Sequence, residues 1–165
     1  MLGIRLLVLF LCLSVTAALA EECLPSSGAA DAQLVLSRPS AGSVSKFFGE
    51  QFDELLNTKK LHDGVDFDDV SGEPVYAARG GVVVEAGKAE AKPKAYLGIY
   101  LRIHHGGEIS TGYGHLSQSL VRVGDCVQPG QEIGKVGSTG LSAGPHLHFQ
   151  LMRGETPEDP LPFVQ

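Results

Sequence analysis

The chain has 165 residues, a formal net charge of −6, 21 glycines and no tryptophan. This acidic balance argues against nucleic acid as a partner and against electrostatic binding to anionic membranes. The length suits a single domain, which we expect to be a monomer. Because the glycines separate short apolar runs, a turn-rich β protein is a better expectation than a helical one.

Residues 1–20 have the pattern of a secretory signal peptide. Arg5 supplies one positive charge, and the run from Leu6 to Val15 is apolar. Residues 18–20 are Ala-Leu-Ala, a small-residue cleavage site. The apolar run is too short for a membrane anchor. We therefore expect cleavage at about Ala20 and a periplasmic or secreted mature chain with no integral membrane segment. Loss of Arg5 would make the net charge −7.

The cysteines support an oxidising compartment. Of the three, Cys12 leaves with the leader, so that Cys23 and Cys126 remain. An even number of cysteines in a secreted chain predicts one disulfide, with two free thiols as the alternative. We expect residues 21–37 to form an extended N-terminal segment that is tied down mainly through Cys23.

The elements expected after this segment are short strands separated by turns. Strands are predicted at Val44–Phe48, Val82–Val84, Ile99–His104, Thr111–Leu116, Val121–Val127 and Gln131–Gly137. The charged stretch Glu50–Lys60 could hold one helical turn, and Lys88–Ala95 is a polar surface loop. Three prolines after Met152 predict a loosely packed C-terminal tail over residues 154–165.

The stretch Gly144-Pro145-His146-Leu147-His148-Phe149-Gln150-Leu151 is predicted to be a turn that leads into a strand. Apolar residues alternate with polar ones after the proline, so that His146 and His148 share one face of the strand. Two imidazoles on one face favour a metal site or a site of proton transfer. The alternative is a pair of ordinary polar residues on a solvated face.

Two other stretches offer partners for these histidines. His62 and Asp66 are four residues apart, and Gly64 between them disfavours a helix, so a loop that runs into a short strand is expected. His115 is predicted to share a strand face with Tyr113 by the two-residue period. The alternative interpretations are a turn or capping carboxylate for Asp66 and a surface histidine for His115.

Together these residues could make a catalytic zinc site. His62, Asp66 and His148 would supply two nitrogen atoms and one carboxylate oxygen, which leaves one coordination position open. His115 and His146 would then be unbound imidazoles that can take a proton or stabilise a developing oxyanion. The two mature cysteines lie apart from the histidine clusters in the sequence and are poor ligand candidates.

The same motifs resemble a known family. H-x-x-x-D at residues 62–66, Y-x-H-L at 113–116 and G-P-H-L-H-F at 144–149 are similar to the signatures of the lysostaphin/LytM-type zinc endopeptidases. The resemblance covers roughly residues 38–153. It implies a mainly β fold, with an antiparallel β-sheet groove of the duplicated hybrid motif type and zinc on the groove floor.

The resemblance also implies an activity and roles for the site residues. The family's zinc ligands correspond to His62, Asp66 and His148, and its catalytic histidines to His115 and His146. His146 would accept a proton and His115 would help to stabilise the oxyanion while a peptide bond of peptidoglycan is hydrolysed, with D,D-cross-links as the first choice. Gln150 stands where the family often has Glu.

Two other functions remain open at this point. Degenerate members of such a family act as non-enzymatic modules that bind and activate cell-wall amidases, and a zinc-bound structural or signalling domain is a further alternative. The complete set of ligands and the two additional histidines favour the enzyme. The sequence therefore predicts a zinc-dependent peptidoglycan endopeptidase.

Overall fold

The structure is a computed structural model that describes residues 23, 34–53, 57–89 and 94–165. The predicted leader and most of the predicted N-terminal segment lie outside these residues. The fold is mainly β with antiparallel sheets, as the sequence predicts, and the helical elements within residues 34–53, 57–89 and 94–165 are two short 3-10 helices, η1 (Lys94–Leu97) and η2 (Leu161–Phe163). No helix in the described part of the chain is long and apolar enough to cross a membrane.

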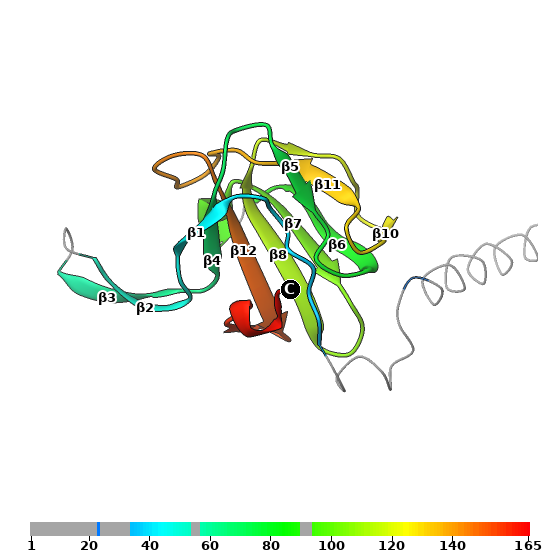
Figure 1. Ribbon diagram of the computed structural model, residues 1–165, viewed down its shortest axis with the longest axis horizontal. Coiled ribbons are helices and arrows are strands. Elements are labelled where there is room, and N and C mark those ends of the chain that lie inside the picture. The colour runs from blue at the N-terminus through cyan, green and yellow to red at the C-terminus, as the bar shows by residue number, and fades with distance from the viewer. Residues whose placement is uncertain (1–22, 24–33, 54–56, 90–93) are drawn as a thin grey trace, which may run out of the picture.

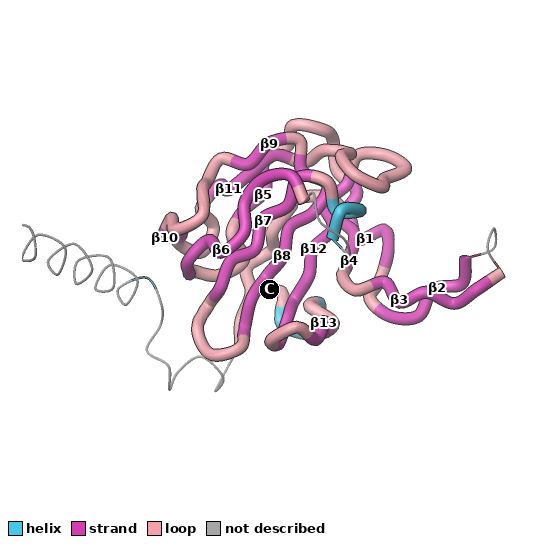
Figure 2. Tube along the Cα trace, turned by 180° about the vertical axis from the view of Figure 1, so that it is seen from behind, coloured by secondary structure: helices cyan, strands magenta, loops and turns pink. Residues whose placement is uncertain are grey.

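The largest sheet has eight strands, and its strands pair antiparallel throughout (Figures 1 and 2). Its order is β1 (Ser43–Lys46), β4 (Val65–Asp68), β12 (His146–Arg153), β8 (Ile109–Leu116), β7 (Ile99–His104), β6 (Gly81–Lys88) and β10 (Cys126–Val127), and β13 (Thr156–Glu158) also pairs with β12. A second sheet has the order β5 (Pro74–Tyr76), β11 (Glu132–Lys135) and β9 (Gln118–Ser119), and β2 (Gly49–Asp53) pairs with β3 (Thr58–His62).

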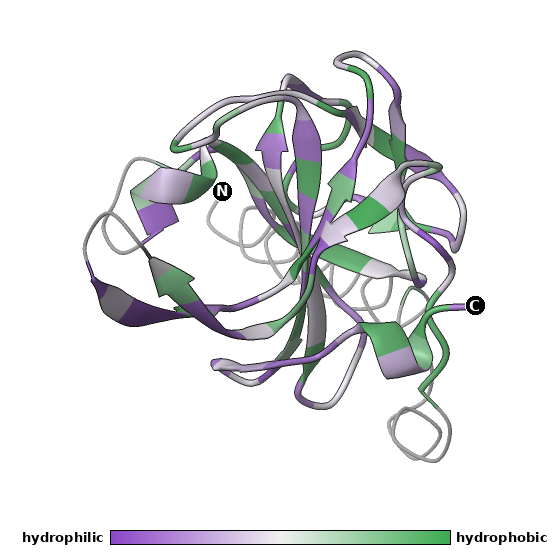
Figure 3. Cartoon of the chain, turned by 60° about the vertical axis from the view of Figure 1, so that its left-hand side comes forward, coloured by the Kyte–Doolittle hydropathy of each residue, from purple (hydrophilic) through white to green (hydrophobic). Residues whose placement is uncertain are grey.

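The hydrophobic core lies between the large sheet and the three-stranded sheet, since buried residues of both belong to one cluster. On β12 the apolar residues Leu147, Phe149 and Leu151 are fully buried, and Figure 3 shows hydrophobic and hydrophilic bands alternating along the strands. Burial of each such side chain contributes about 1.5–3 kcal/mol. The apolar face of β12 therefore fixes which way its polar face points.

In the charged stretch Glu50–Lys60, the described residues 50–53 and 57–60 lie in strands and at a turn, so the prediction of a helical turn is wrong for them. Its described residues form the β2–β3 hairpin, paired from Gly49↔His62 to Asp53↔Thr58, which projects from the body of the protein (Figure 1). Asn57 has a φ of 50°, a left-handed conformation that suits a tight turn. The hairpin matters for function because His62 is its last residue.

The C-terminal residues are not a loose tail either. After Gly154, β13 turns back on β12, and η2 delivers Val164 to a parallel bridge with Leu36. The backbone N–H of Leu36 donates to Phe163 O at 2.8 Å, and that of Gln165 donates to Leu36 O at 2.9 Å. Leu36 is fully buried, so the end of the chain is part of the folded domain. Proline is compatible with this arrangement because it occupies an edge strand and the start of a 3-10 helix.

Smaller differences concern strand lengths, whereas the cysteines are paired as the sequence predicts. The strand predicted at Val121–Val127 is reduced to β10, and the one predicted at Val44–Phe48 ends at Lys46. A disulfide joins Cys23 to Cys126, whose Cα atoms are 5.6 Å apart and which are separated by 103 residues in the sequence.

Candidate metal centre

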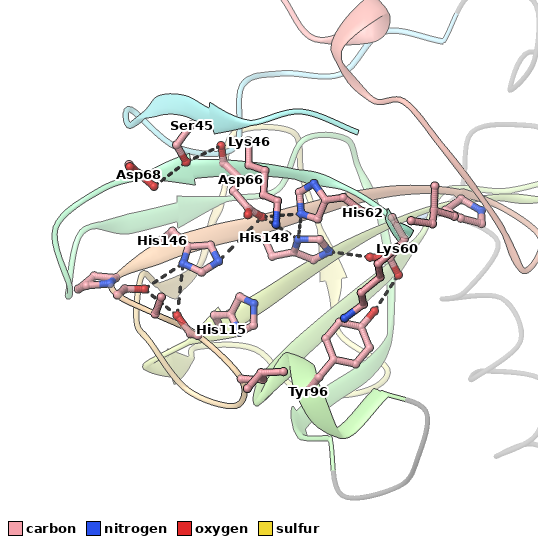
Figure 4. A pocket seen from close by; sticks show the side chains of 18 residues that line it. Ser45, Lys46, Lys60, His62, Asp66, Asp68, Tyr96, His115, His146 and His148 are labelled. Carbon is pink, nitrogen blue, oxygen red and sulfur yellow. Dashed lines mark hydrogen bonds and ion pairs between the residues drawn. The ribbon is translucent and has the colours of Figure 1, made fainter. Parts of the chain in front are cut away.

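Three side chains from three strands bring their ligand atoms together (Figure 4). His148 on β12 lies directly opposite Asp66 on β4, so the two side chains share a face of the sheet. His148 Nδ1 lies 2.8 Å from Asp66 Oδ1, and His62 Nε2 lies 3.1 Å from the same oxygen and 3.2 Å from His148 Nδ1. These three distances are close to the separation of about 3.3 Å between ligand atoms of a tetrahedral zinc site.

The other ring nitrogen of each ligand histidine is held by an acceptor. His62 Nδ1 donates to Phe47 O at 2.8 Å, and His148 Nε2 donates to Asp63 Oδ1 at 3.2 Å. Such acceptors fix the tautomer and the orientation of a metal-binding imidazole. His62 Nε2 and His148 Nδ1 are therefore left with lone pairs directed at the same point as the Asp66 carboxylate.

Three acceptors this close together need a shared proton or cation. Burial alone would raise the pKa of Asp66, but hydrogen bonds with His148 and His62 outweigh it and hold the pKa below its usual value. Burial would lower the pKa of His148, but its bonds to Asp63 and Asp66 raise the pKa instead. The chemistry of this set, two imidazole nitrogens and a carboxylate oxygen, fits zinc.

Gly64 explains how the turn between β3 and β4 approaches His148 so closely. A Cβ atom at this position would lie 2.5 Å from the backbone Phe149 O and 2.8 Å from His148 Cε1. Real Cβ atoms do not tolerate such contacts, so any larger residue would displace the turn from β12 or the His148 ring. The glycine within the H-x-x-x-D motif therefore has a steric role at the site.

His115 reaches the site by an irregularity in β8. Tyr113 points into the core and is fully buried, so the prediction that His115 shares its face is wrong. The pairing of β7 with β8 shifts register at this end, and His115 adopts a φ of 60°, which is uncommon for a residue other than glycine. As a result the His115 ring turns toward the pocket, with ring centroids 4.6 Å from His146 and 5.9 Å from His148.

The two histidines outside the ligand set are also oriented by backbone acceptors. His115 Nδ1 donates to Thr139 O at 2.8 Å, and His146 Nδ1 donates to Gly144 O at 2.9 Å. Both acceptors belong to the small-residue loop before β12. His146 Nε2 lies 3.9 Å from Asp66 Oδ1. Burial lowers the pKa of His115 to about 4, so its ring is neutral at neutral pH.

The five predicted site residues line one open pocket of about 1260 Å³. Figure 4 shows His62, Asp66 and His148 grouped together, with His146 and His115 beside them. The pocket is bordered on one side by the β3 end of the hairpin and on the other by the loop at residues 141–145. The space is large enough for an extended peptide to lie across the histidines.

A chain of hydrogen bonds behind the ligands was missed by sequence reasoning. Asp63, which fits a turn or capping carboxylate in the sequence, bonds His148 and accepts a hydrogen bond from Tyr96 Oη at 2.7 Å. The hydrogen bonds with His148 and Tyr96 lower the pKa of Asp63 to about 2, although burial alone would raise it. Nearby, Gln150 accepts a hydrogen bond from Tyr100 Oη at 3.1 Å. The available signal was that Gln150 shares the face of His148.

A two-histidine, one-aspartate set of ligand atoms beside two unliganded imidazoles is the donor arrangement of a metal-dependent hydrolase. Residues 60–160 match peptidase family M23, and the chain belongs to this family. M23 peptidases are zinc-dependent and hydrolyse peptidoglycan, and the His62, Asp66 and His148 group could bind a metal.

Known relatives support the assignment. Lysostaphin of Staphylococcus simulans is 43% identical over 109 residues, which cover 64% of this chain and 22% of the relative. The peptidoglycan DD-endopeptidase ShyA of Vibrio cholerae is 44% identical over 97 residues, which cover 58% of this chain and 21% of the relative. The chain thus spans about a fifth of the length of these curated relatives.

Solved structures show the same fold. The catalytic domain of lysostaphin from Staphylococcus simulans superposes with a TM-score of 0.66 at 35% identity, over 76% of this chain and 98% of that one. A zinc-containing peptidase from Vibrio cholerae gives a TM-score of 0.69 at 31% identity, over 77% of this chain and 39% of that one.

Proposed function

We propose that this protein is a zinc-dependent endopeptidase that hydrolyses peptide cross-links of bacterial peptidoglycan. The observation that carries the proposal is the geometry of the four pocket histidines. Each has one ring nitrogen held by an acceptor, and two are joined to Asp66 in a triangle of ligand atoms while two remain beside it. A purely structural zinc would not require the second pair.

His62, Asp66 and His148 would hold the zinc. When bound, zinc lowers the pKa of a water molecule and polarises a carbonyl group. The hydrogen bonds of His62 to Phe47 and of His148 to Asp63 keep the ligand nitrogens aimed at the site while substrate enters. Since Asp66 is the single carboxylate in the set, the site keeps a net positive charge that favours a developing oxyanion.

His146 is the proposed proton acceptor. Its Nδ1 proton is engaged by Gly144 O, so Nε2 carries the lone pair that can take a proton from the attacking water. The protonated ring can then give the proton to the leaving amine, as a general acid–base group does. Ser142 Oγ, 3.3 Å from His146 Nδ1, adds a second polar contact that holds the ring in place.

His115 is the proposed partner of the oxyanion. Its Nδ1 proton is engaged by Thr139 O, so Nε2 is an acceptor in the neutral ring and donates only after it takes a second proton from bulk solvent, to which the pocket is open. Negative charge that develops on a nearby substrate oxygen raises the proton affinity of the ring. His115 would therefore act as a donor late on the path to the tetrahedral intermediate.

Peptidoglycan is the proposed substrate because the curated relatives include a peptidoglycan endopeptidase and the sequence predicts secretion. The test is to incubate the purified, zinc-loaded mature chain with intact sacculi and to analyse soluble fragments by mass. New amino termini on intact glycan strands, lost on chelation and restored by zinc, are expected. His146→Ala, which keeps the ligand set, is the matched control.

The opposite results would be equally informative. Cut glycan strands, or no zinc-dependent products from several wall types, would contradict the endopeptidase. Stimulation of a purified cell-wall amidase by a chain that releases no fragments itself would instead identify a non-enzymatic activator.

A further inference from the structure

Two lysines share the pocket with the proposed ligands because of strand register. Lys46 on β1 lies directly opposite Asp66 on β4, and directly opposed residues project from the same face. Lys60 on β3 stands two residues before His62, so it shares the face of His62 by the two-residue period. Both side chains line the pocket, and Figure 4 shows them among its residues, Lys60 beside Tyr96.

Neither lysine is neutralised by a carboxylate of the described residues. Other lysines of the same part of the chain are paired: Lys59 with Glu50 at 3.0 Å, Lys94 with Glu85 at 2.6 Å and Lys135 with Glu132 at 2.7 Å. No such pair joins Lys46 or Lys60 to a described carboxylate. The Lys60 ammonium lies 5.8 Å from the Tyr96 ring centroid, which directs it along the pocket wall.

The carboxylates of the pocket have other partners. Asp66 bonds the ligand histidines, Asp63 bonds His148 and Tyr96, and Asp68 accepts from Ser45. The two ammonium groups are thus available to a ligand. An ammonium group is a donor without acceptor capacity and acts as a point charge, so its best partner in a peptide is a free carboxylate.

We propose that Lys46 and Lys60 form a subsite for a free carboxylate of the peptide substrate, next to the bond that is cut. The inference rests on the proposed function and adds the substrate class, a peptide with an ionised carboxyl group rather than a neutral bridge. Local cations are needed for such a ligand because the whole chain has a net charge of −6 and would otherwise repel an anionic peptide.

The experiment compares two synthetic cross-linked stem peptides that differ only in a carboxylate or a carboxamide beside the scissile bond. Calorimetry measures binding of each to zinc-loaded His146→Ala, and the active chain gives kcat/KM for each. We expect binding of the carboxylate peptide to be about 10-fold tighter, with the preference shrinking between about 50 mM and about 500 mM salt because the lysines are exposed. In kinetics the difference should appear mainly in KM.

The lysine variants locate the effect. Lys46→Gln and Lys60→Gln should each reduce the preference about 3-fold, and the double variant should abolish it. Lys59→Gln is the matched control, since Lys59 neighbours Lys60 but lies on the opposite face of the hairpin and pairs with Glu50. It should leave the preference unchanged.

Three results would overturn the subsite: equal binding of both peptides, a preference that survives in the double variant, or loss of preference in Lys59→Gln. Survival in the double variant would mean that the carboxylate binds elsewhere, such as at the metal. Because binding is measured on an inactive variant, the test decides the subsite even if neither peptide is cleaved, and the absence of cleavage counts only against the endopeptidase.

Discussion

Two groups of histidine and hydroxyl side chains differ in how their hydrogen bonds are completed. In the core, the Ala78 N–H donates to Tyr113 Oη at 2.9 Å, Tyr113 and Thr111 hydroxyls bond at 2.9 Å, and Thr111 bonds His105 Nε2 at 2.8 Å. His105 Nδ1 then donates to Gly80 O at 2.9 Å. Every group in this series has a hydrogen-bond partner, and each group donates to the next one along the series.

In the pocket group, only one of the two ring nitrogens of each histidine donates a hydrogen bond to the protein. His62, His115, His146 and His148 each donate one ring N–H to the protein. Their remaining nitrogens point at a common space, where the described residues offer no set of donors to satisfy them all. A fully paired buried network stabilises one structure, whereas convergent lone pairs stabilise a bound cation or accept a proton. The same residue type is thus structural in one place and chemical in the other.

Removal of a metal ligand should have the largest effect on this contrast. We expect about one zinc per chain in the wild-type protein and close to none in His148→Ala, because two ligands cannot hold the ion in a catalytic site. Metal content after dialysis, measured by atomic emission, tests this. His105→Gln should retain zinc, since His105 belongs to the core group. Equal zinc in wild type and His148→Ala would remove His148 from the ligand set.

The two unliganded histidines should separate chemistry from metal binding. His115→Ala and His146→Ala should keep zinc and lose about 10²–10⁴-fold in kcat, the usual contribution of a general acid–base group. Steady-state cleavage of a cross-linked peptide and metal content on the same samples give both readouts. Loss of zinc in His146→Ala would show that a ligand had been mistaken for a base.

The sequence predicted the parts of the site that depend on local periodicity. Alternation along β12 places His146 and His148 opposite a buried apolar face, and the H-x-x-x-D spacing corresponds to a turn into β4, as predicted. The predicted antiparallel β fold is confirmed as well. These features follow from side-chain alternation in strands and from glycine at a turn, which a single sequence displays.

What the sequence could not provide depends on contacts between distant residues. The bulge that turns His115 away from the Tyr113 face is a shift between β7 and β8. The Asp63–Tyr96 bond joins residues 33 apart in the sequence. The end of the chain is ordered by pairing with Leu36, against the local signal of its prolines. In each case tertiary pairing overrides the local pattern.

The core group should affect the pH dependence of folding stability rather than the binding of zinc. Burial lowers the pKa of His105 from 6.5 to about 4, and the nearby charges of Arg79 and His104 act in the same direction. The unfolded chain therefore binds more protons between these values, so this contribution to stability is complete above about pH 6.5 and is lost as pH falls toward 4. The loss amounts to about 3 kcal/mol.

Protonation of His105 is unfavourable because it would reverse the donor and acceptor roles in the hydrogen bonds of the core group. A proton on His105 Nε2 would reverse the Thr111 and Tyr113 hydroxyls, and the Tyr113 hydroxyl would then face the Ala78 N–H, donor against donor. Urea unfolding at pH 7 and pH 4, with chelator present, should show a smaller acid loss in His105→Gln than in wild type. The same acid loss in both proteins would contradict this account.

The smallest expected effect is on zinc affinity and comes from changing Asp63, the hydrogen-bond partner of His148. Asp63 gives His148 a completed bond on one side while its other nitrogen faces the metal centre. Asp63→Asn keeps the size of the side chain but removes the charge and allows the amide to present a donor to His148 Nε2. Loss of the carboxylate that orients a metal-binding histidine typically costs about 10–100-fold in metal affinity, and we expect an increase of that size in the zinc dissociation constant.

Tyr96→Phe serves as the matched variant for Asp63→Asn. It removes the hydroxyl that donates to Asp63 Oδ2 at 2.7 Å and leaves the carboxylate in place, so a smaller weakening of zinc binding is expected. Competition with a chromophoric chelator measures the dissociation constants without reliance on activity. If Asp63→Asn binds zinc as tightly as wild type, Asp63 does not orient His148, and its bond to the ring serves only the turn between β3 and β4.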